Sequence, residues 1–431
     1  MFEIAFPLSL LAFAHSLQSI WRGHVVAIPL AILSAQTLAA ALAWKMGFIT
    51  TFAMTWSRGG QVEFGAINVA YFFATYLIVL AIYLLKRRHP AYHYSVASFT
   101  DLIRKRKENR FPLIALMLLA FSIYHFSILD LEVIFRNSQY ILMSSPAVVV
   151  VKTPINIFVH AAQGLVGLIV IVYLSISIVN RRWGQVLILF PPAIWFLVFN
   201  ITAHSRLAVV YAVFFALPLF LSGKRSHKGF ALLFFAFAFL NLVNSLNGRG
   251  SSDQGLSAIF NYFDQSFDFS TLNAFDLIGN VVEGVFVQGD GFFYSTHDYP
   301  LGYKLTALSP LPSFIDGYST HYIQFQLRHN RFVPFGATTE IRLFGIQYVA
   351  IYFSIMIYAY LKVFSLLRRK KFILFLISIS VFSLATYLQF TYPTRNTIRF
   401  FYLIILLNVA SHLFGSVKRS WLGHLQKERS R

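Results

Sequence analysis

Several arginines of this 431-residue chain stand in short polar stretches between long apolar runs. The first, Arg206, lies in the run TAHSRL at residues 202–207, directly before an apolar stretch. Ser205 can cap a helix that begins there, and a helix N-terminus attracts anions through its unpaired N–H groups and its positive dipole end. With the added guanidinium, this turn is a candidate phosphate site. The alternative is an arginine that reaches up to the lipid headgroups.

A second set of basic residues follows later in the chain. Guanidinium groups suit a diphosphate because they bind it through paired hydrogen bonds and stay charged at any working pH. For members of this set that lie in an acidic segment, the alternative is pairing with the segment's own carboxylates. The pattern predicts a polyanionic ligand and does not specify a reaction. The candidates for substrate binding are Arg249, His321, Arg328, Arg331, Arg342, Arg395 and Arg399.

Glu340 is the first candidate for acid–base chemistry. It lies in the run FGATTEIR, and a carboxylate there can accept a proton from a hydroxyl nucleophile. The alternative role for Glu340 is an acidic residue in a first helical turn that offsets the helix dipole. His321 and the pair His297-Asp298 are further acid–base candidates. The histidines show no metal-ligand spacing, cysteine is absent, and no phosphate-binding glycine loop is visible, so we expect neither a metal nor a cofactor.

The composition excludes an ordinary soluble fold, because 57% of residues are hydrophobic, 12% are charged and the mean hydropathy is +0.63. Charge is distributed unevenly: residues 247–342 hold 9 of the 16 acidic side chains but 5 of the 36 Lys and Arg residues. The net charge of +20 would favour nucleic acid in a soluble protein. Here the basic residues flank apolar spans, so membrane topology and anionic lipid headgroups explain them, and no nucleic-acid partner is expected.

About 20 mostly apolar residues are needed for a helix to cross the hydrocarbon core. The span at 186–203 contains Pro191 and Pro192, which remove backbone hydrogen bonds and make it the least regular one. The sequence predicts about eleven spans, at 3–20, 25–44, 66–85, 111–129, 154–179, 186–203, 207–222, 229–246, 343–361, 372–391 and 400–415.

The loops between these spans fix the expected orientation. Alternate loops, together with the tail from Ser416, contain 24 of the 36 basic residues, which places them in the cytoplasm by the positive-inside rule. The N-terminus is then periplasmic and the C-terminus cytoplasmic. We therefore expect an all-α polytopic membrane protein. Its domains are a first bundle of eight spans (1–246), a large extracytoplasmic loop domain (247–342), and three last spans with a basic tail (343–431).

Inside the loop domain, two kinds of structure are expected. Residues 256–286 interleave aromatic and aliphatic side chains with Asp and Asn, which predicts amphipathic helices on the membrane surface. Residues 289–334 are dominated by Gly, Pro, Tyr and His, which predicts irregular loops over a cavity.

This arrangement resembles the bacterial O-antigen and oligosaccharide-repeat-unit polymerases, whose membrane architecture is shared with the O-antigen ligases. Ser205-Arg206, followed by an apolar span, is similar to the Ser-Arg pair at the start of a helix that borders the active site in that family. The run GATTEIRLFG at 336–345 is similar to the family's glycine–glutamate–aromatic-glycine stretch, where the large outer loop rejoins the membrane. The likeness covers most of the chain as topology and these two short motifs as sequence.

The resemblance implies a metal-independent glycosyltransferase of the bacterial inner membrane with a GT-C-like helix bundle. It would polymerise oligosaccharide repeats carried on undecaprenyl diphosphate, which serve as donor and acceptor, at the periplasmic face among membrane lipids and beside a chain-length regulator protein. Arg206 would hold the lipid diphosphate with an outer-loop arginine assisting. The chain departs from the related ligases in having no clear His-Asn pair late in the outer loop, unless His329-Asn330 takes that part. Through this comparison His329 joins Glu340 as a candidate catalytic base.

Three other classes remain open. An O-antigen ligase would differ in using lipid A core as acceptor. A GT-C glycosyltransferase acting on polyprenyl-phosphate sugars typically has acidic residues in its first outer loop, whereas residues 45–65 contain only Glu63. A lipid-linked glycan flippase would favour charges within the spans and broken helices around a midplane site.

Overall fold

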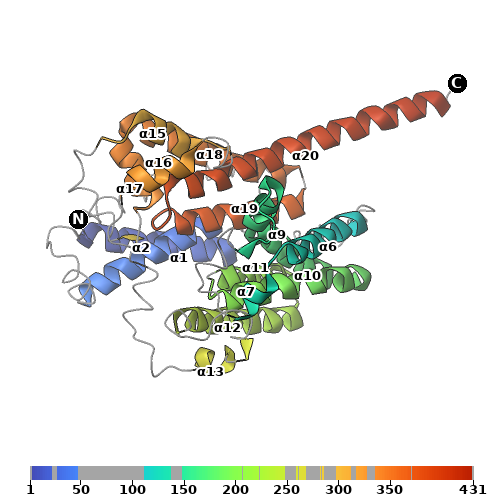
Figure 1. The fold of residues 1–431 in the computed structure, drawn as a ribbon, viewed down its shortest axis with the longest axis horizontal. Coiled ribbons are helices and arrows are strands. Elements are labelled where there is room, and N and C mark those ends of the chain that lie inside the picture. Colours follow the sequence, from blue (N-terminus) through green and yellow to red (C-terminus); the bar gives the residue numbers. More distant parts are fainter. Residues whose placement is uncertain are drawn as a thin grey trace. The chain divides into compact units, whose positions relative to one another are not determined.

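A computed structural model of the chain consists of helices joined by turns and loops (Figure 1). Within the described residues the extended structure is limited to an isolated antiparallel bridge between Leu129 and Val149. The structure describes residues 2–21, 27–46, 111–136, 148–205, 207–222, 224–247, 259–260, 262–267, 282, 284–285, 298–311, 317–327, 335–369 and 371–429.

The helices belong to two compact units. The first unit, Met1–His93 with Ile278–Arg431, contains α1 (Phe2–Trp21), α2 (Ile28–Lys45), α15 (Leu301–Leu308), α16 (Tyr318–Phe325), α17 (Ala337–Phe344), α18 (Ile346–Arg368), α19 (Phe372–Leu388) and α20 (Thr394–Arg429). The second unit, Tyr94–Leu277, contains α6 (Phe111–Ser127), α7 (Leu131–Arg136), α9 (Pro154–Val179), α10 (Trp183–Thr202), α11 (Leu207–Leu221), α12 (Arg225–Asn247) and α13 (Tyr262–Phe267). The chain passes between the units twice, after His93 and after Leu277, and the second of these boundaries falls inside the 247–342 segment.

Four described helices are long and apolar enough to cross a membrane: α9, α10, α18 and residues 225–245 of α12. Shorter apolar helices lie within α1, α2, α6, α11 and α19. Every predicted span coincides with a helix except 66–85, which lies outside the described residues. The fold is that of an all-α membrane protein.

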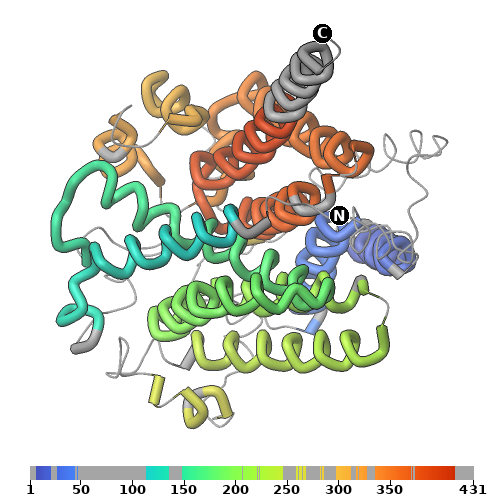
Figure 2. Tube along the Cα trace, turned by 90° about the vertical axis from the view of Figure 1, so that its right-hand side faces the viewer, coloured from blue at the N-terminus to red at the C-terminus, as the bar shows by residue number. Residues whose placement is uncertain are grey.

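In the second unit, α9 to α12 run back and forth, with α11 packed on both α9 and α12 (Figure 2). Small residues let α9 and α11 approach closely. The Tyr211 hydroxyl of α11 donates a 2.9 Å hydrogen bond to the Gly164 carbonyl of α9, and a Cβ at Gly167 would lie 2.2 Å from the Tyr211 hydroxyl oxygen. Gly167 thus makes room for a buried tyrosine between two apolar helices, and Gly164 makes room for Leu207.

Pro191 and Pro192 do not interrupt α10, which continues from Trp183 to Thr202. The prolines lie at mid-helix, and a membrane helix tolerates them because neighbouring helices and local adjustments satisfy the freed carbonyls. This span is therefore more regular than the sequence suggests.

In the first unit, α19 packs on α2, and α18 and α19 both pack on α20. The Gln36 side chain of α2 donates a 3.2 Å hydrogen bond to the carbonyl of Tyr387 in α19, which joins residues from the two ends of the sequence. The short helices α15, α16 and α17 gather beside the start of α18 (Figure 1).

The expectation of irregular loops over 289–334 is wrong in part, because α15 and α16 form there. Their tyrosines pack into a buried cluster with Phe344 and Tyr348, and this packing favours helix where local composition favours loop. Much of the predicted amphipathic stretch at 256–286 lies outside the described residues, and its described part includes the short helix α13.

Gly336 sits where the start of α17 meets the turn between α19 and α20. A Cβ at Gly336 would lie 2.2 Å from the Phe390 carbonyl oxygen. The same turn accepts two hydrogen bonds from the start of α17. The Ala337 N–H donates to the Tyr392 carbonyl at 2.7 Å, and the Thr338 N–H donates to the Gln389 carbonyl at 3.2 Å. The absent side chain thus allows two backbone segments to hydrogen-bond directly.

We expect Gly336→Ala to lower the free energy of unfolding by about 2–3 kcal/mol, because a backbone carbonyl cannot rotate away from the added methyl group. Thermal unfolding in detergent measures the effect. Gly229→Ala is the matched control, since a Cβ there meets no atom within 4 Å and alanine favours helix by up to about 1 kcal/mol. Equal unfolding temperatures for the two variants would contradict the close approach.

Candidate functional site

Glu340 lies in the first turn of α17 with its side chain fully buried, at 0% exposure. Both of its carboxylate oxygens accept hydrogen bonds: Oε1 from the Tyr303 hydroxyl at 2.8 Å and Oε2 from the Thr394 backbone N–H at 2.7 Å. Thr394 is the first residue of α20. Glu340 therefore satisfies an N–H group that the start of a helix leaves unpaired, and its negative charge faces the positive dipole ends of α17 and α20.

A stack of aromatic rings holds Tyr303 against this carboxylate. The rings of Tyr299 and Tyr303 stack with centroids 5.2 Å apart, and Tyr318 lies 6.0 Å from Tyr303 on a nearly parallel plane. Phe344 closes the cluster edge-on, 5.0 Å from Tyr299 and 5.8 Å from Tyr303. The three short helices are thereby packed around one buried acid.

Burial raises the pKa of Glu340 above its usual value, because the charged form loses solvation. The N–H of Thr394 and the hydroxyl of Tyr303 favour the charged form and oppose this rise. Burial and the neighbouring Glu340 carboxylate both raise the pKa of Tyr303, so Tyr303 keeps its proton and donates a hydrogen bond to Glu340. The pair accommodates either charge state of Glu340, since a protonated Oε1 can donate to the Tyr303 oxygen.

Arg395 and Arg399, on the first turns of α20, approach one carbonyl group. Arg395 donates one guanidinium hydrogen bond to the Thr306 carbonyl and another to the Leu311 carbonyl at 2.8 Å. Arg399 also donates to Leu311, so the two guanidinium groups lie side by side. Arg395 is fully buried and its guanidinium lies 4.2 Å from the Tyr318 ring centroid, whereas Arg399 is half-buried.

The other described candidates lie on neighbouring helices. Arg342 is half-buried at the end of α17, and burial lowers its pKa to about 10, which leaves the guanidinium charged at neutral pH. His321 on α16 stacks on Phe325 with ring centroids 5.9 Å apart. The structure thus gathers Glu340, Arg342, Arg395 and Arg399 on α17 and the start of α20. Arg206, Arg249, Arg328, His329 and Arg331 lie outside the described residues.

The turn before Arg206 is described up to Ser205. The Ser205 hydroxyl accepts the Leu207 backbone N–H at 3.2 Å, as predicted for a residue that caps this helix. His204 is buried with a left-handed backbone (φ 45°), and the Ser205 N–H donates to the Asn200 carbonyl at 2.9 Å. The chain therefore forms a tight hydrogen-bonded turn at the end of α10 before α11 begins.

Within the part of the chain that the structure describes, no three His, Asp or Glu side chains are grouped to hold a metal ion. Glu340 accepts hydrogen bonds from the Tyr303 hydroxyl and the Thr394 backbone N–H. The arrangement provides guanidinium groups and a helix N-terminus, which are suited to anions.

Sequence analysis did not single out Tyr303 and Thr394, the two partners of Glu340. It also missed a polar group inside the second unit: the Nε2 of His125 lies 3.3 Å from the Nδ1 of His160, and the Trp195 indole donates to the Nδ1 of His125 at 3.1 Å. Both histidines are buried. The signal for them was available, because an ionisable residue within an apolar span marks a position of interest.

The fold and the site together define a class: an all-α membrane protein with a buried carboxylate and adjacent arginines where its last helices begin. Comparison of the chain with protein-family models, with curated proteins and with solved structures gives no match.

Proposed function

We propose that this chain is a membrane glycosyltransferase that polymerises undecaprenyl-diphosphate-linked oligosaccharide repeats at the outer face of the bacterial inner membrane. The observation that carries the proposal is the pairing of the Arg395 and Arg399 guanidinium groups on the Leu311 carbonyl at the N-terminus of α20. Two adjacent cations at the start of α20 exceed the single charge of the Glu340 carboxylate that is bonded to the Thr394 N–H, and an anionic ligand would stabilise the remaining positive charge. The reaction is inferred from the oligosaccharide-repeat polymerases that the Ser205-Arg206 and 336–345 motifs resemble.

The proposed reaction needs electrostatic help more than a cofactor. A hydroxyl of the acceptor sugar attacks the anomeric carbon of the donor, a new C–O bond forms, and the C–O bond to the diphosphate breaks. The electron pair of that bond leaves with the undecaprenyl diphosphate, and the hydroxyl proton passes to a base or to water. Because charge grows on phosphate oxygens, cations fixed in advance are the main requirement.

In this proposal Arg206 holds the donor diphosphate. Arg399, the more exposed of the paired arginines, contacts a ligand directly, whereas Arg395 holds the segment at 306–311 in place. Arg249, Arg328, Arg331, Arg342 and His321 complete the substrate-binding set. His329 stays the candidate base. Glu340 is buried with both oxygens occupied, which favours its alternative role of fixing the start of α20.

The finer topology is part of the same proposal. About eleven spans with a periplasmic N-terminus and a cytoplasmic C-terminus place 247–342, with its acidic excess, outside the cytoplasm. The helices α15, α16 and α17 then stand at the periplasmic ends of α18 and α20. A second candidate function, transport of a lipid-linked glycan, draws on the His125–His160 pair, because buried ionisable residues in spans are typical of transporters.

Deletion of the gene distinguishes the polymerase from the ligase and the flippase. We expect the deletion strain to display lipid A core that carries a single repeat, because ligation and flipping still operate. Gel analysis of its lipopolysaccharide, with a complemented strain as control, provides the measurement. Bare core without any repeat would instead indicate a ligase or a flippase and would overturn the polymerase assignment.

A further inference from the structure

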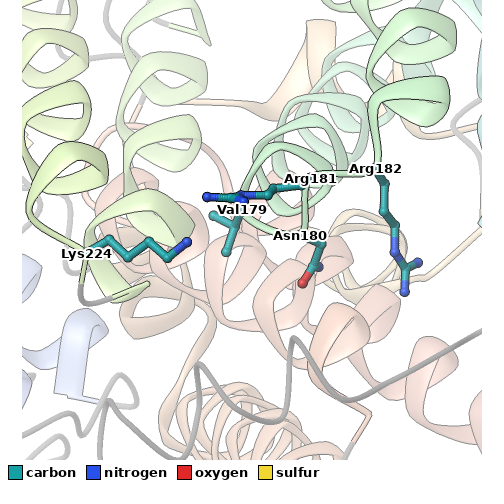
Figure 3. A pocket seen from close by; sticks show the side chains of 5 residues that line it. All are labelled: Val179, Asn180, Arg181, Arg182 and Lys224. Atoms are coloured by element: carbon teal, nitrogen blue, oxygen red, sulfur yellow. The ribbon is translucent and has the colours of Figure 1, made fainter.

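A pocket of about 310 Å³ lies at one end of the second unit, lined by Val179, Asn180, Arg181, Arg182 and Lys224. It is formed by two turns, the one from α9 to α10 and the one from α11 to α12. Arg181 and Lys224 extend toward each other from these two turns (Figure 3). Three of the five lining side chains are cationic, so the pocket concentrates positive charge.

The backbone at Arg181 is held in a conformation that arginine disfavours. Its φ of 56° is left-handed, and the turn closes with the Arg181 N–H on the Ile178 carbonyl at 3.0 Å and the Arg182 N–H on the Ser177 carbonyl at 2.9 Å. This is the helix ending in which glycine is usual at the left-handed position. A non-glycine residue there is strained, and such strain is typical of functional positions. Arginine at this position therefore calls for a role that glycine lacks.

Asn180 adds a polar group to the same wall. Its side-chain oxygen is buried and has no hydrogen-bond partner among the described residues. Buried polar groups are nearly always bonded, so this acceptor on the pocket wall indicates a solvent molecule or a ligand that carries a donor such as a hydroxyl group. A side-chain amide beside three cations can donate its N–H groups to an anion.

The carboxylates of the described part of the second unit lie at its other end. Asp130 and Glu132 precede α9, with the Asp130 N–H bonded to the Val148 carbonyl, and Asp264 lies on α13 beside the end of α12. Helices that run back and forth bring the ends of α9 and α11 and the starts of α10 and α12 together at the pocket end. The cationic side chains of the pocket and these three carboxylates therefore lie at opposite ends of the helices.

We propose that this pocket is a binding site for a phosphate group. Arg181, Lys224 and Arg182 supply charge-assisted hydrogen bonds, and Asn180 supplies an amide. Two sources present phosphate at the end of a membrane helix bundle, an anionic phospholipid headgroup and a soluble phosphate compound. Basic pockets between membrane helices on the cytoplasmic side take lipid headgroups of this kind. This site is independent of the proposed glycosyltransferase activity.

A simpler role, in which Arg181 and Arg182 only offset the dipole at the end of α9, requires neither Lys224 nor the strained backbone. The experiment separates the two roles. Thermal unfolding of the full chain is followed in phosphatidylcholine–detergent micelles, with phosphatidylglycerol added in one arm and sodium phosphate, against chloride at equal ionic strength, in the other. We expect a saturable rise in unfolding temperature in at least one arm. Arg181→Gln with Lys224→Gln should raise the half-saturating concentration roughly tenfold or more.

Arg225→Gln with Lys228→Gln is the matched control. This pair also removes two positive charges, but from α12, and neither residue lines the pocket. Arg181→Gly is a second variant that keeps the turn: without added anion it should unfold a few degrees higher than wild type, because the strain is relieved, and it should still lose the response. A response to phosphatidylglycerol alone assigns a lipid, and a response to phosphate assigns a soluble source. No response in either arm, or an equal loss in the control pair, overturns the proposal.

Discussion

Replacing Arg206 with alanine will abolish long glycan chains while the protein remains inserted and expressed. In the proposed reaction the guanidinium meets charge that grows on the leaving diphosphate, and removing one such group costs about 10²–10³-fold in rate. A polymer builds up by repeated transfers, so a loss of transfer rate of that size removes the bands of long glycan chains from the gel ladder entirely. Gel analysis of lipopolysaccharide from a strain that produces the variant measures the effect.

Two comparison variants make this result specific. Arg206→Lys keeps the charge but loses paired hydrogen bonds, so we expect shortened chains. Arg225→Ala removes another arginine from the start of a helix of the same unit, at the end that carries the basic pocket, and should leave the ladder unchanged. A normal ladder from stably produced Arg206→Ala protein would remove the central residue of the proposal.

Replacing Glu340 with alanine will lower the free energy of unfolding by roughly 3–5 kcal/mol. The change leaves the Tyr303 hydroxyl and the Thr394 N–H buried without an acceptor, at about 1–3 kcal/mol each, and opens a small cavity. Thermal unfolding in detergent gives the magnitude. Glu340→Gln preserves an acceptor for Thr394 and an amide that can donate to Tyr303, so it should avoid this loss and be at least as stable as wild type at neutral pH.

Comparison of wild type with Glu340→Gln gives a pH dependence of stability with a defined sign. The folded-state pKa of Glu340 is raised above 4.5, so the folded chain holds its proton where the unfolded chain has released it. Its contribution to stability is complete below pH 4.5 and is lost as pH rises toward the raised pKa. Wild-type unfolding temperature should therefore fall relative to Glu340→Gln across that range. A constant difference between the two proteins would contradict a raised pKa.

Glu340→Gln also separates the two roles of the carboxylate. A general base contributes about 10²–10⁴-fold, so glutamine would abolish chain elongation if Glu340 accepted the proton. A residue that fixes the start of α20 through hydrogen bonds works as an amide. We expect elongation to persist in Glu340→Gln and to fail in Glu340→Ala, and the opposite ranking would restore Glu340 as the base.

The sequence predicted the positions of the described apolar helices well, because long apolar runs carry a strong local signal. α9 coincides with its predicted range of 154–179, and the cap from Ser205 is present. Long-range packing was not predictable in the same way. Nothing in the local composition around Tyr303 indicates that its hydroxyl meets Glu340, 37 positions away, or that the Arg395 guanidinium lies over the Tyr318 ring. Those contacts arise from the tertiary packing of α15, α16 and α20.

One expectation was wrong for an identifiable reason. Composition at 289–334 favours loops, yet a buried tyrosine cluster stabilises α15 and α16. The helix predicted at 186–203 is present, since α10 continues through Pro191 and Pro192. The left-handed Arg181 shows a second limit, because arginine at a position that usually belongs to glycine gives no warning in sequence.

The most direct test of the central claim uses the purified chain and lipid-linked repeat units in detergent, with no nucleotide sugar and no ion gradient. We predict that wild-type protein converts undecaprenyl-diphosphate-linked repeats into longer lipid-linked chains, that it releases undecaprenyl diphosphate, and that Arg206→Ala does neither. Failure of folded wild-type protein to lengthen its verified native substrate would contradict the account and shift it toward transport.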